Sequence, residues 1–209
     1  MCCFLFHDEL FQLLKEIGLD IAIHGRPNEL EEAIPFHENE KNCHYDGNAV
    51  KNFWEVMVKI NCVFNAFRSN FIGKCSPVHL FWGAFDLAVT RFSGKTAPLH
   101  PGGAPNMPLE VMQEAYSHEV SSAGFWPGGD SFPEPLFYSY CYPTPADFSK
   151  QSIKPKTAFF NEDLGEFVLL YKDLIATENP DNTLMEFLET TYLAAAKTLS
   201  WDREALEKK

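Results

Sequence analysis

The sequence predicts an α+β fold in which an antiparallel or mixed β-sheet is covered by one long helix and a C-terminal helix. Three observations support this prediction. Apolar residues recur every three or four positions across residues 47–72, as on the buried face of a long helix. Short strand-like runs separated by Gly and Pro fill residues 77–171, and a second helical pattern covers residues 180–199. The 209 residues are enough for one such domain.

The N-terminal residues predict a helix followed by a strand. Apolar side chains share one face of a helix over residues 4–17, and Gly18 is placed to end it. Residues 19–24 then alternate in polarity, which is the period of a half-buried strand. This strand would have no neighbour nearby in the sequence.

Both long helices have recognisable start signals. The first is predicted over residues 47–72, with Asp46 as its N-cap and Gly73 as its stop. Its apolar stripe would also suit a coiled coil, but a helix that packs across a sheet is the commoner structure. The C-terminal helix is predicted to begin at Pro180, capped by Asn179.

The sheet is predicted from runs rich in aromatic and β-branched residues. The first two runs flank Gly83 so closely that they form either a bulged strand or a tight hairpin. The last run is a hairpin that turns at residues 163–165. The predicted strand segments are residues 78–82, 85–92, 118–125, 136–142 and 157–171.

The composition is that of an acidic, folded globular protein. Hydrophobic residues make up 45% of the chain and charged residues 22%, and the formal net charge is −12. This charge would repel a phosphate backbone, so we expect no nucleic-acid partner. No apolar stretch has a membrane-spanning length, so we expect no membrane partner. The six cysteines lack metal-binding or redox spacing, which predicts reduced thiols in a cytoplasmic protein.

Two long motifs resemble a known family. FIGKCSPVHLFWGAFDLAVTRFSG (residues 71–94) and EAYSHEVSSAGFWPGG (residues 114–129) are similar to mostly bacterial proteins grouped as domain of unknown function 5996. Residues 34–54 and 158–171 match the same family in texture, so the resemblance covers nearly the whole chain. The family has no assigned activity, and the resemblance therefore implies an architecture and no function.

The resemblance also implies a domain organisation. Family members carry a further N-terminal segment, which would make residues 1–209 a single α+β domain from the C-terminal portion of a longer protein. Residues 1–25 would be the helix and strand remnant of an upstream unit, residues 26–45 an acidic linker, and residues 46–209 the main body.

Three polar residues near the first motif predict a metal site. His79, Asp86 and His118 lie on strands that could be neighbours, and strand alternation could bring them within reach of one another. Two histidines and a carboxylate can hold iron, zinc or manganese with open positions for substrate. The spacing is not that of an HxD or HExxH motif, so histidines hydrogen-bonded inside an aromatic core are the commoner explanation.

Further side chains suggest other chemistry. Lys74 and Arg91 are cations beside aromatic residues, a setting that suits an anionic ligand, although pairing with nearby carboxylates is more common. Trp82 and Trp126 are expected to line an apolar pocket, with Trp126 at its mouth. Cys75 is a candidate nucleophile, although no papain-like motif surrounds it and a buried structural thiol is the more common role.

These residues predict a pocket for the binding or conversion of a small molecule. In a catalytic version, His79 or His118 would be the general base or metal ligand, Asp86 its orienting partner and Arg91 the anion clamp. Glu119, next to His118, belongs to the same candidate catalytic set. The alternative is a non-catalytic interaction or ligand-sensing module with a structural polar cluster. No motif specifies a cofactor or an oligomeric state.

Overall fold

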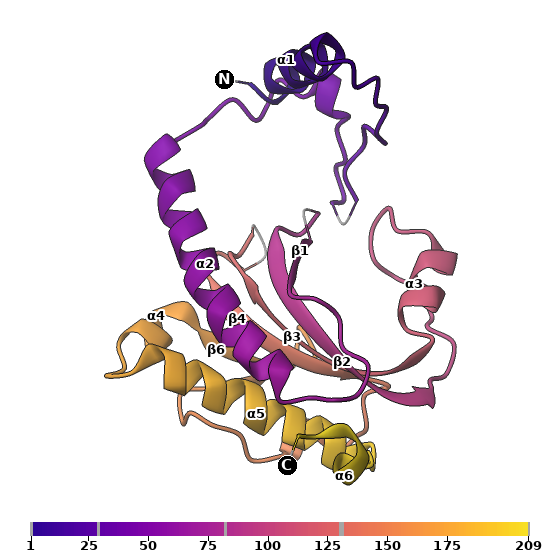
Figure 1. The fold of residues 1–209 in the computed structure, drawn as a ribbon, viewed down its shortest axis with the longest axis vertical. Coiled ribbons are helices and arrows are strands. Elements are labelled where there is room, and N and C mark those ends of the chain that lie inside the picture. Colours follow the sequence, from indigo (N-terminus) through magenta and orange to yellow (C-terminus); the bar gives the residue numbers. More distant parts are fainter. Residues whose placement is uncertain (1, 29, 82, 130–131, 209) are drawn as a thin grey trace.

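The computed structural model describes residues 2–28, 30–81, 83–129 and 132–208, which contain one six-stranded antiparallel sheet and two long helices (Figure 1). The strand order is β1-β2-β3-β4-β6-β5, and each neighbouring pair is antiparallel. This arrangement confirms the predicted α+β class. The strands are β1 (His79–Phe81), β2 (Asp86–Thr96), β3 (His118–Trp126), β4 (Leu136–Tyr142), β5 (Phe159–Asn161) and β6 (Glu166–Leu170).

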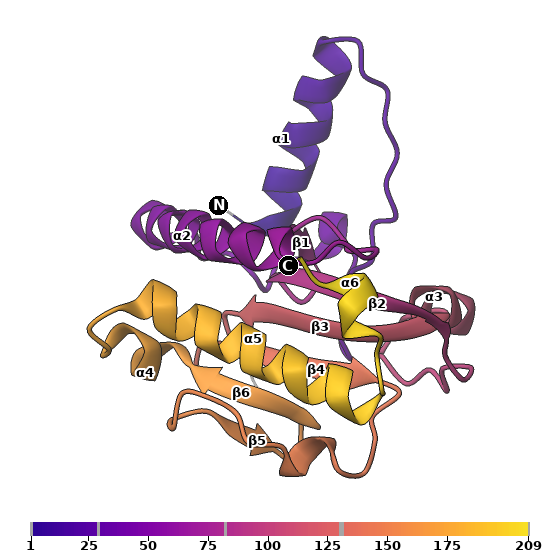
Figure 2. The ribbon, with the colours of Figure 1, turned by 60° about the horizontal axis from the view of Figure 1, so that its bottom comes forward.

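The helices α2 and α5 lie together against one face of the sheet (Figure 2). Side chains from both helices and from the strands close a core around Phe64, Phe137 and Phe187, all fully buried. Each such ring contributes roughly 1.5–3 kcal/mol by leaving water. The helices are α1 (Cys3–Glu16), α2 (Gly47–Ser69), α3 (Leu109–Ala115), α4 (Tyr171–Ile175), α5 (Pro180–Thr198) and α6 (Arg203–Leu206), with single 3-10 turns η1 (Phe36–Glu38) and η2 (Phe148–Lys150).

Strand alternation separates an apolar from a polar face. On β2, Leu87 and Val89 join the core beneath the helices. Asp86, Ala88 and Thr90 face the opposite way, as the sequence predicts, and line a cavity. Of the two structures predicted for the runs around Gly83, a bulged strand or a tight hairpin, the structure has the hairpin, because β1 pairs antiparallel with β2. We call the side of the sheet opposite α2 and α5 the open face.

The end of α2 differs from the prediction. The helix was expected to continue to residue 72 and stop at Gly73, but it ends at Ser69. Beyond it, the backbone N–H of Ile72 donates to the carbonyl of Leu206, 2.8 Å away, so the chain leaves the helix to pair with the C-terminal segment. A Cβ on Gly73 would lie 2.5 Å from the Leu206 side chain. Gly73 therefore permits a close approach, and it does not cap the helix.

The N-terminal segment stands apart from the sheet. The predicted helix is present as α1, which projects away from the sheet (Figure 2) and has no fully buried residue. The strand predicted over residues 19–24 is wrong, because this segment is irregular. Cys2 and Cys43, predicted as reduced thiols, form a disulfide. Cys2 and Cys43 are 41 residues apart in the sequence, and backbone hydrogen bonds between the segments around them bring them together. Their spacing in the sequence does not predict this disulfide.

The cap of α5 gives a first prediction. The side chain of Asn179 accepts a hydrogen bond from the backbone N–H of Asn182, as its position before Pro180 predicts. Asn179→Ala should lower the free energy of unfolding by about 1 kcal/mol, because one helical N–H loses its acceptor. Urea denaturation measures the change. Asn182→Ala is the control, because it keeps the backbone donor and should change stability by less than about 0.5 kcal/mol.

No helix in the part of the chain that the structure describes combines the length and the apolar character that crossing a membrane requires.

Candidate functional site

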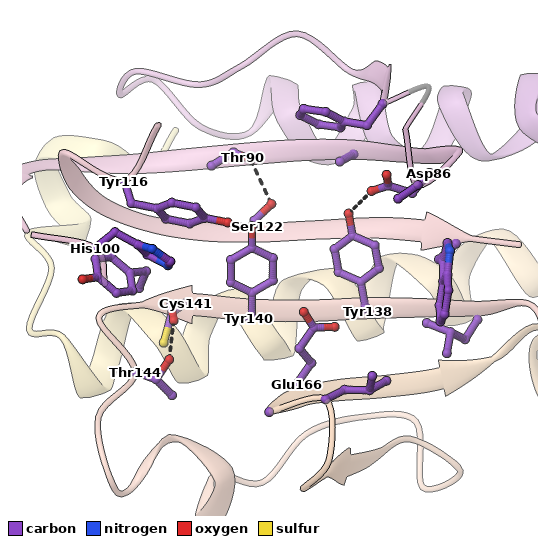
Figure 3. A pocket seen from close by; sticks show the side chains of 18 residues that line it. Asp86, Thr90, His100, Tyr116, Ser122, Tyr138, Tyr140, Cys141, Thr144 and Glu166 are labelled. Atoms are coloured by element: carbon purple, nitrogen blue, oxygen red, sulfur yellow. Dashed lines mark hydrogen bonds between the residues drawn. The ribbon is translucent and has the colours of Figure 1, made fainter. Parts of the chain in front are cut away.

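The open face contains a cavity of about 630 Å³. The strand register brings its side chains together. Ser122 on β3 lies opposite Thr90 on β2 and Tyr140 on β4, so alternate residues of the three strands face the same side of the sheet. Figure 3 shows these side chains rising from neighbouring strands. We call this cavity the open-face pocket. Its aromatic, hydroxyl and carboxyl side chains include Phe81, Asp86, Thr90, His100, Tyr116, Ser122, Trp126, Tyr138, Tyr140 and Glu166.

A hydrogen bond crosses the floor of the pocket from β4 to β2. The Tyr138 hydroxyl donates to Oδ2 of Asp86, passing over β3 (Figure 3). The β3 residue beneath the ring is Gly124, which pairs with both Ala88 and Tyr138. A Cβ on Gly124 would lie 2.3 Å from the Tyr138 ring. Only glycine therefore lets the phenol reach Asp86.

Gly124→Ala tests this arrangement. The added methyl group should displace the Tyr138 ring and leave Asp86 without its donor, lowering the free energy of unfolding by about 1–3 kcal/mol. Urea denaturation of the single and double variants measures the cost. In a Tyr138→Ala background the same change should cost less than about 0.5 kcal/mol, because there is no ring to displace. Equal costs in both backgrounds would show that the ring is not the cause.

Two carboxyl groups in the pocket resist ionisation. Asp86 is 8% exposed, and burial raises its pKa, against the opposing effects of the Tyr138 hydrogen bond and the charge of His79. Burial and the negative charge of Asp86 raise the pKa of Glu166 to about 7. No hydrogen bond or salt bridge joins the Glu166 carboxyl group to another residue that the structure describes. Figure 3 shows this group pointing toward the space between Tyr138 and Tyr140.

Phenols and hydroxyls line the rest of the pocket. The hydroxyl oxygens of Tyr116 and Tyr140 lie 2.8 Å apart and share a hydrogen bond, and Thr90 and Ser122 make a similar contact of 2.9 Å. Burial holds the pKa values of Tyr138 and Tyr140 well above the usual range, so both phenols stay protonated at neutral pH.

His100 closes one end of the pocket. Its ring stacks on Tyr116 with centroids 4.6 Å apart and lies 5.0 Å from the Tyr142 ring. The backbone N–H of Gly102 donates a 3.0 Å hydrogen bond to Nδ1, which fixes the orientation of the ring.

The predicted metal residues are not brought together. His79 pairs with Ala88 in the register, near Asp86. His118 pairs with Thr96, ten residues along β2 from Asp86, because a bulge follows Phe92. In the described ranges, no group of three or more His, Cys, Asp or Glu side chains could hold a metal ion.

The other predicted residues are divided between the two faces. Trp126 lines the open-face pocket together with Asp86, whereas Trp82 lies outside the described residues. Glu119 accepts a hydrogen bond from the Ser93 hydroxyl at 2.9 Å and lies outside the pocket lining.

The two predicted cations also lie away from the pocket. Arg91 is 1% exposed beneath the helices, with its guanidinium 3.4 Å from the centroid of the Phe67 ring. The Lys74 ammonium group lies 5.0 Å from the centroid of the Phe92 ring. Neither residue contributes to the pocket lining.

Sequence reasoning missed the most unusual group of the pocket, Glu166. It directly follows Gly165, at the start of a strand whose next residues are apolar. The alternation of the strand could have shown which face of the sheet Glu166 lies on. Its neighbours, however, depend on the pairing of β6 with β4. Tyr138 and Tyr140 gave a clearer signal, because their spacing of two residues places them on one face of a strand.

Comparison with known proteins gave one match. A family model described as "Family of unknown function (DUF5996)" matches residues 3–208. Neither the curated proteins nor the solved structures yielded a match.

Proposed function

The chain belongs to DUF5996, a family of unknown function, and we propose that its open-face pocket binds a small molecule, which it either senses or converts. One observation carries the proposal: a cavity of about 630 Å³ surrounds a carboxyl group, Glu166, that lacks a partner among the described residues. Pockets for small ligands usually have volumes of roughly 300–1,000 Å³ and a few convergent polar groups in aromatic surroundings.

The energetics support a functional role for Glu166. Glu166 is half-buried, and partly removing a carboxylate from water without a partner costs folding free energy. Groups with strongly perturbed pKa values cluster at functional sites for this reason. A ligand that contacts Glu166 would recover part of this cost. The unpaired carboxylate would therefore contribute to ligand binding.

A catalytic version of the proposal keeps Asp86 from the residues expected from the sequence and adds Glu166. A carboxyl group whose pKa is about 7 suits general acid or base catalysis near neutral pH. Asp86, oriented by Tyr138, would hold the ligand. His118, Glu119 and Arg91 lie outside the pocket lining, so the proposal gives them no direct contact with the ligand.

The non-catalytic version, a ligand sensor, uses the same pocket and the same contacts. It differs only in leaving the bound molecule unchanged. Recovery of the bound molecule intact after prolonged incubation, followed by mass spectrometry, supports the sensor. Appearance of a product that Glu166→Gln does not form supports the enzyme.

The binding itself is tested with isotope-labelled tyrosine. The chain has seven tyrosines, of which Tyr138 and Tyr140 lie in the pocket while Tyr171 and Tyr192 lie on the helix side. Small amines, alcohols and carboxylic acids are added singly, and ring signals are assigned with Tyr→Phe variants. We expect at least one class to shift the pocket signals and leave Tyr171 and Tyr192 unmoved. Shifts confined to the helix-side rings, or no shift with any class, would contradict the proposal.

A further inference from the structure

We infer that the ligand of the open-face pocket is an organic cation, an amine attached to an apolar or aromatic group. The inference rests on the proposed function and names the class of molecule that this pocket recognises. Charge, aromatic surroundings and proton linkage each contribute to it.

The charge of the pocket is one-sided. Asp86 and Glu166 both line it, and among the described lining residues there is neither a lysine nor an arginine. The Nδ1 atom of His100, which also lines the pocket, already accepts a hydrogen bond from the backbone of Gly102. The whole chain carries a formal charge of −12, so long-range attraction favours cations as well.

Aromatic rings surround the two carboxyl groups. The rings of Tyr138 and Tyr140 are stacked with centroids 6.2 Å apart, and Phe81 and Trp126 add further aromatic surface. Figure 3 shows the Glu166 carboxyl group directed at the space between the two tyrosines. An ammonium group placed there would meet a carboxylate and aromatic rings together, a combination that proteins use to bind organic cations.

Other ligand classes fit the same groups less well. An anion would be repelled by Asp86 and Glu166. A neutral polyol would need free hydroxyl partners, but Thr90 and Ser122 already bind each other. It would also leave the repulsion between the two carboxylates in place. A bound cation would offset the repulsion between Asp86 and Glu166. It would also replace the water contacts that these carboxylates lose by burial.

Binding of a cation should be coupled to a proton on Glu166. The groups that face Glu166 are Asp86 from β2 and the protonated phenols Tyr138 and Tyr140 from β4. The pKa of Glu166 is about 7 in the free protein, so about half of the molecules carry this proton at pH 7. A bound ammonium lowers the pKa, and binding should release roughly half a proton. Affinity should rise about tenfold from pH 6 to pH 8.

The test is calorimetry of the full chain with three matched probes: phenethylamine, 2-phenylethanol and phenylacetate. They share the phenyl group and differ in charge. We expect only the amine to bind, with heats in two buffers of different ionisation enthalpy that report proton release. Glu166→Gln and Asp86→Asn should each weaken amine binding at least about tenfold. Glu162→Gln, at an exposed carboxylate on the same hairpin, should leave it unchanged.

Each outcome separates this inference from the proposed function. Amine selectivity with proton release supports both. Equal or tighter binding of the alcohol or the acid would overturn the cation inference while leaving a binding pocket in place. If none of the three binds but only an alcohol or a carboxylic acid shifts the pocket tyrosine signals, the cation class is again wrong. If neither experiment detects a ligand, both are overturned.

Discussion

Arg91→Ala should lower the free energy of unfolding by about 3–5 kcal/mol, the largest effect we expect from a single substitution in this chain. The guanidinium is 1% exposed and lies between the rings of Phe67 and Tyr192, at 3.4 and 4.3 Å from their centroids. It also donates to the Phe67 carbonyl and lies 3.6 Å from a carboxylate oxygen of Glu189. Alanine would remove the stacking, empty the space between these rings, and take a side-chain donor from the Phe67 carbonyl and the counter-charge from Glu189.

Urea denaturation at neutral pH measures the loss. Arg91→Met should cost roughly half as much, because its side chain refills most of the volume without restoring the charge. Arg203→Ala, at a half-exposed arginine of α6, is the surface control and should cost less than about 1 kcal/mol. A cost below about 1 kcal/mol for Arg91→Ala would contradict this structural role. Ligand binding by a folded Arg91→Met variant should match that of the unmodified chain.

Glu166→Gln should stabilise the protein at alkaline pH, the second large effect. Glu166 has an ordinary pKa of 4.5 when unfolded and a pKa of about 7 when folded, so the folded state binds more protons between these values. Its contribution to stability is therefore complete below pH 4.5 and is lost as the pH rises through 7. From pH 5 to pH 8 the loss should be about 2.5 kcal/mol. Glutamine cannot ionise, so the variant does not lose this stability as the pH rises.

The measured quantity is the difference in unfolding free energy between Glu166→Gln and the unmodified chain at pH 5 and at pH 8. Taking this difference cancels the titration of groups elsewhere, and Glu162→Gln provides the exposed control with no change between the two pH values. If the difference in unfolding free energy between Glu166→Gln and the unmodified chain is also the same at both pH values, the Glu166 carboxylate is solvated and the pocket does not shield it from water. A stabilised variant that binds the amine poorly would show that the carboxylate serves binding at the expense of stability.

Local signals predicted most of the elements. Asn179 and Pro180 mark the start of α5 by their own backbone chemistry, and the structure confirms them. Alternation along β2 places Asp86 and Arg91 on opposite faces of one strand. Alternation does not say which face the helices cover, so the sequence could not show that Arg91 lies among core rings.

The candidate site was less predictable because it depends on register. His118 was expected near Asp86, but the bulge between Phe92 and Thr96 and the strand pairing place it at the far end of β2. Tyr138 reaches Asp86 only because Gly124 lies between them. Glu166 joins the pocket through the pairing of β6 with β4. None of these long-range relations is encoded in the local pattern of polar and apolar residues.

The protonation state of Glu166 underlies both the proposed pocket and its preference for a cation. The side-chain carboxyl signal of Glu166 in NMR spectra, followed through a pH titration, reports that state. We predict a midpoint near pH 7 in the free protein, with a lower midpoint in Asp86→Asn because a neighbouring negative charge is removed. A midpoint near 4.5, the ordinary value for glutamate, would show a solvated carboxylate and contradict the proposed pocket.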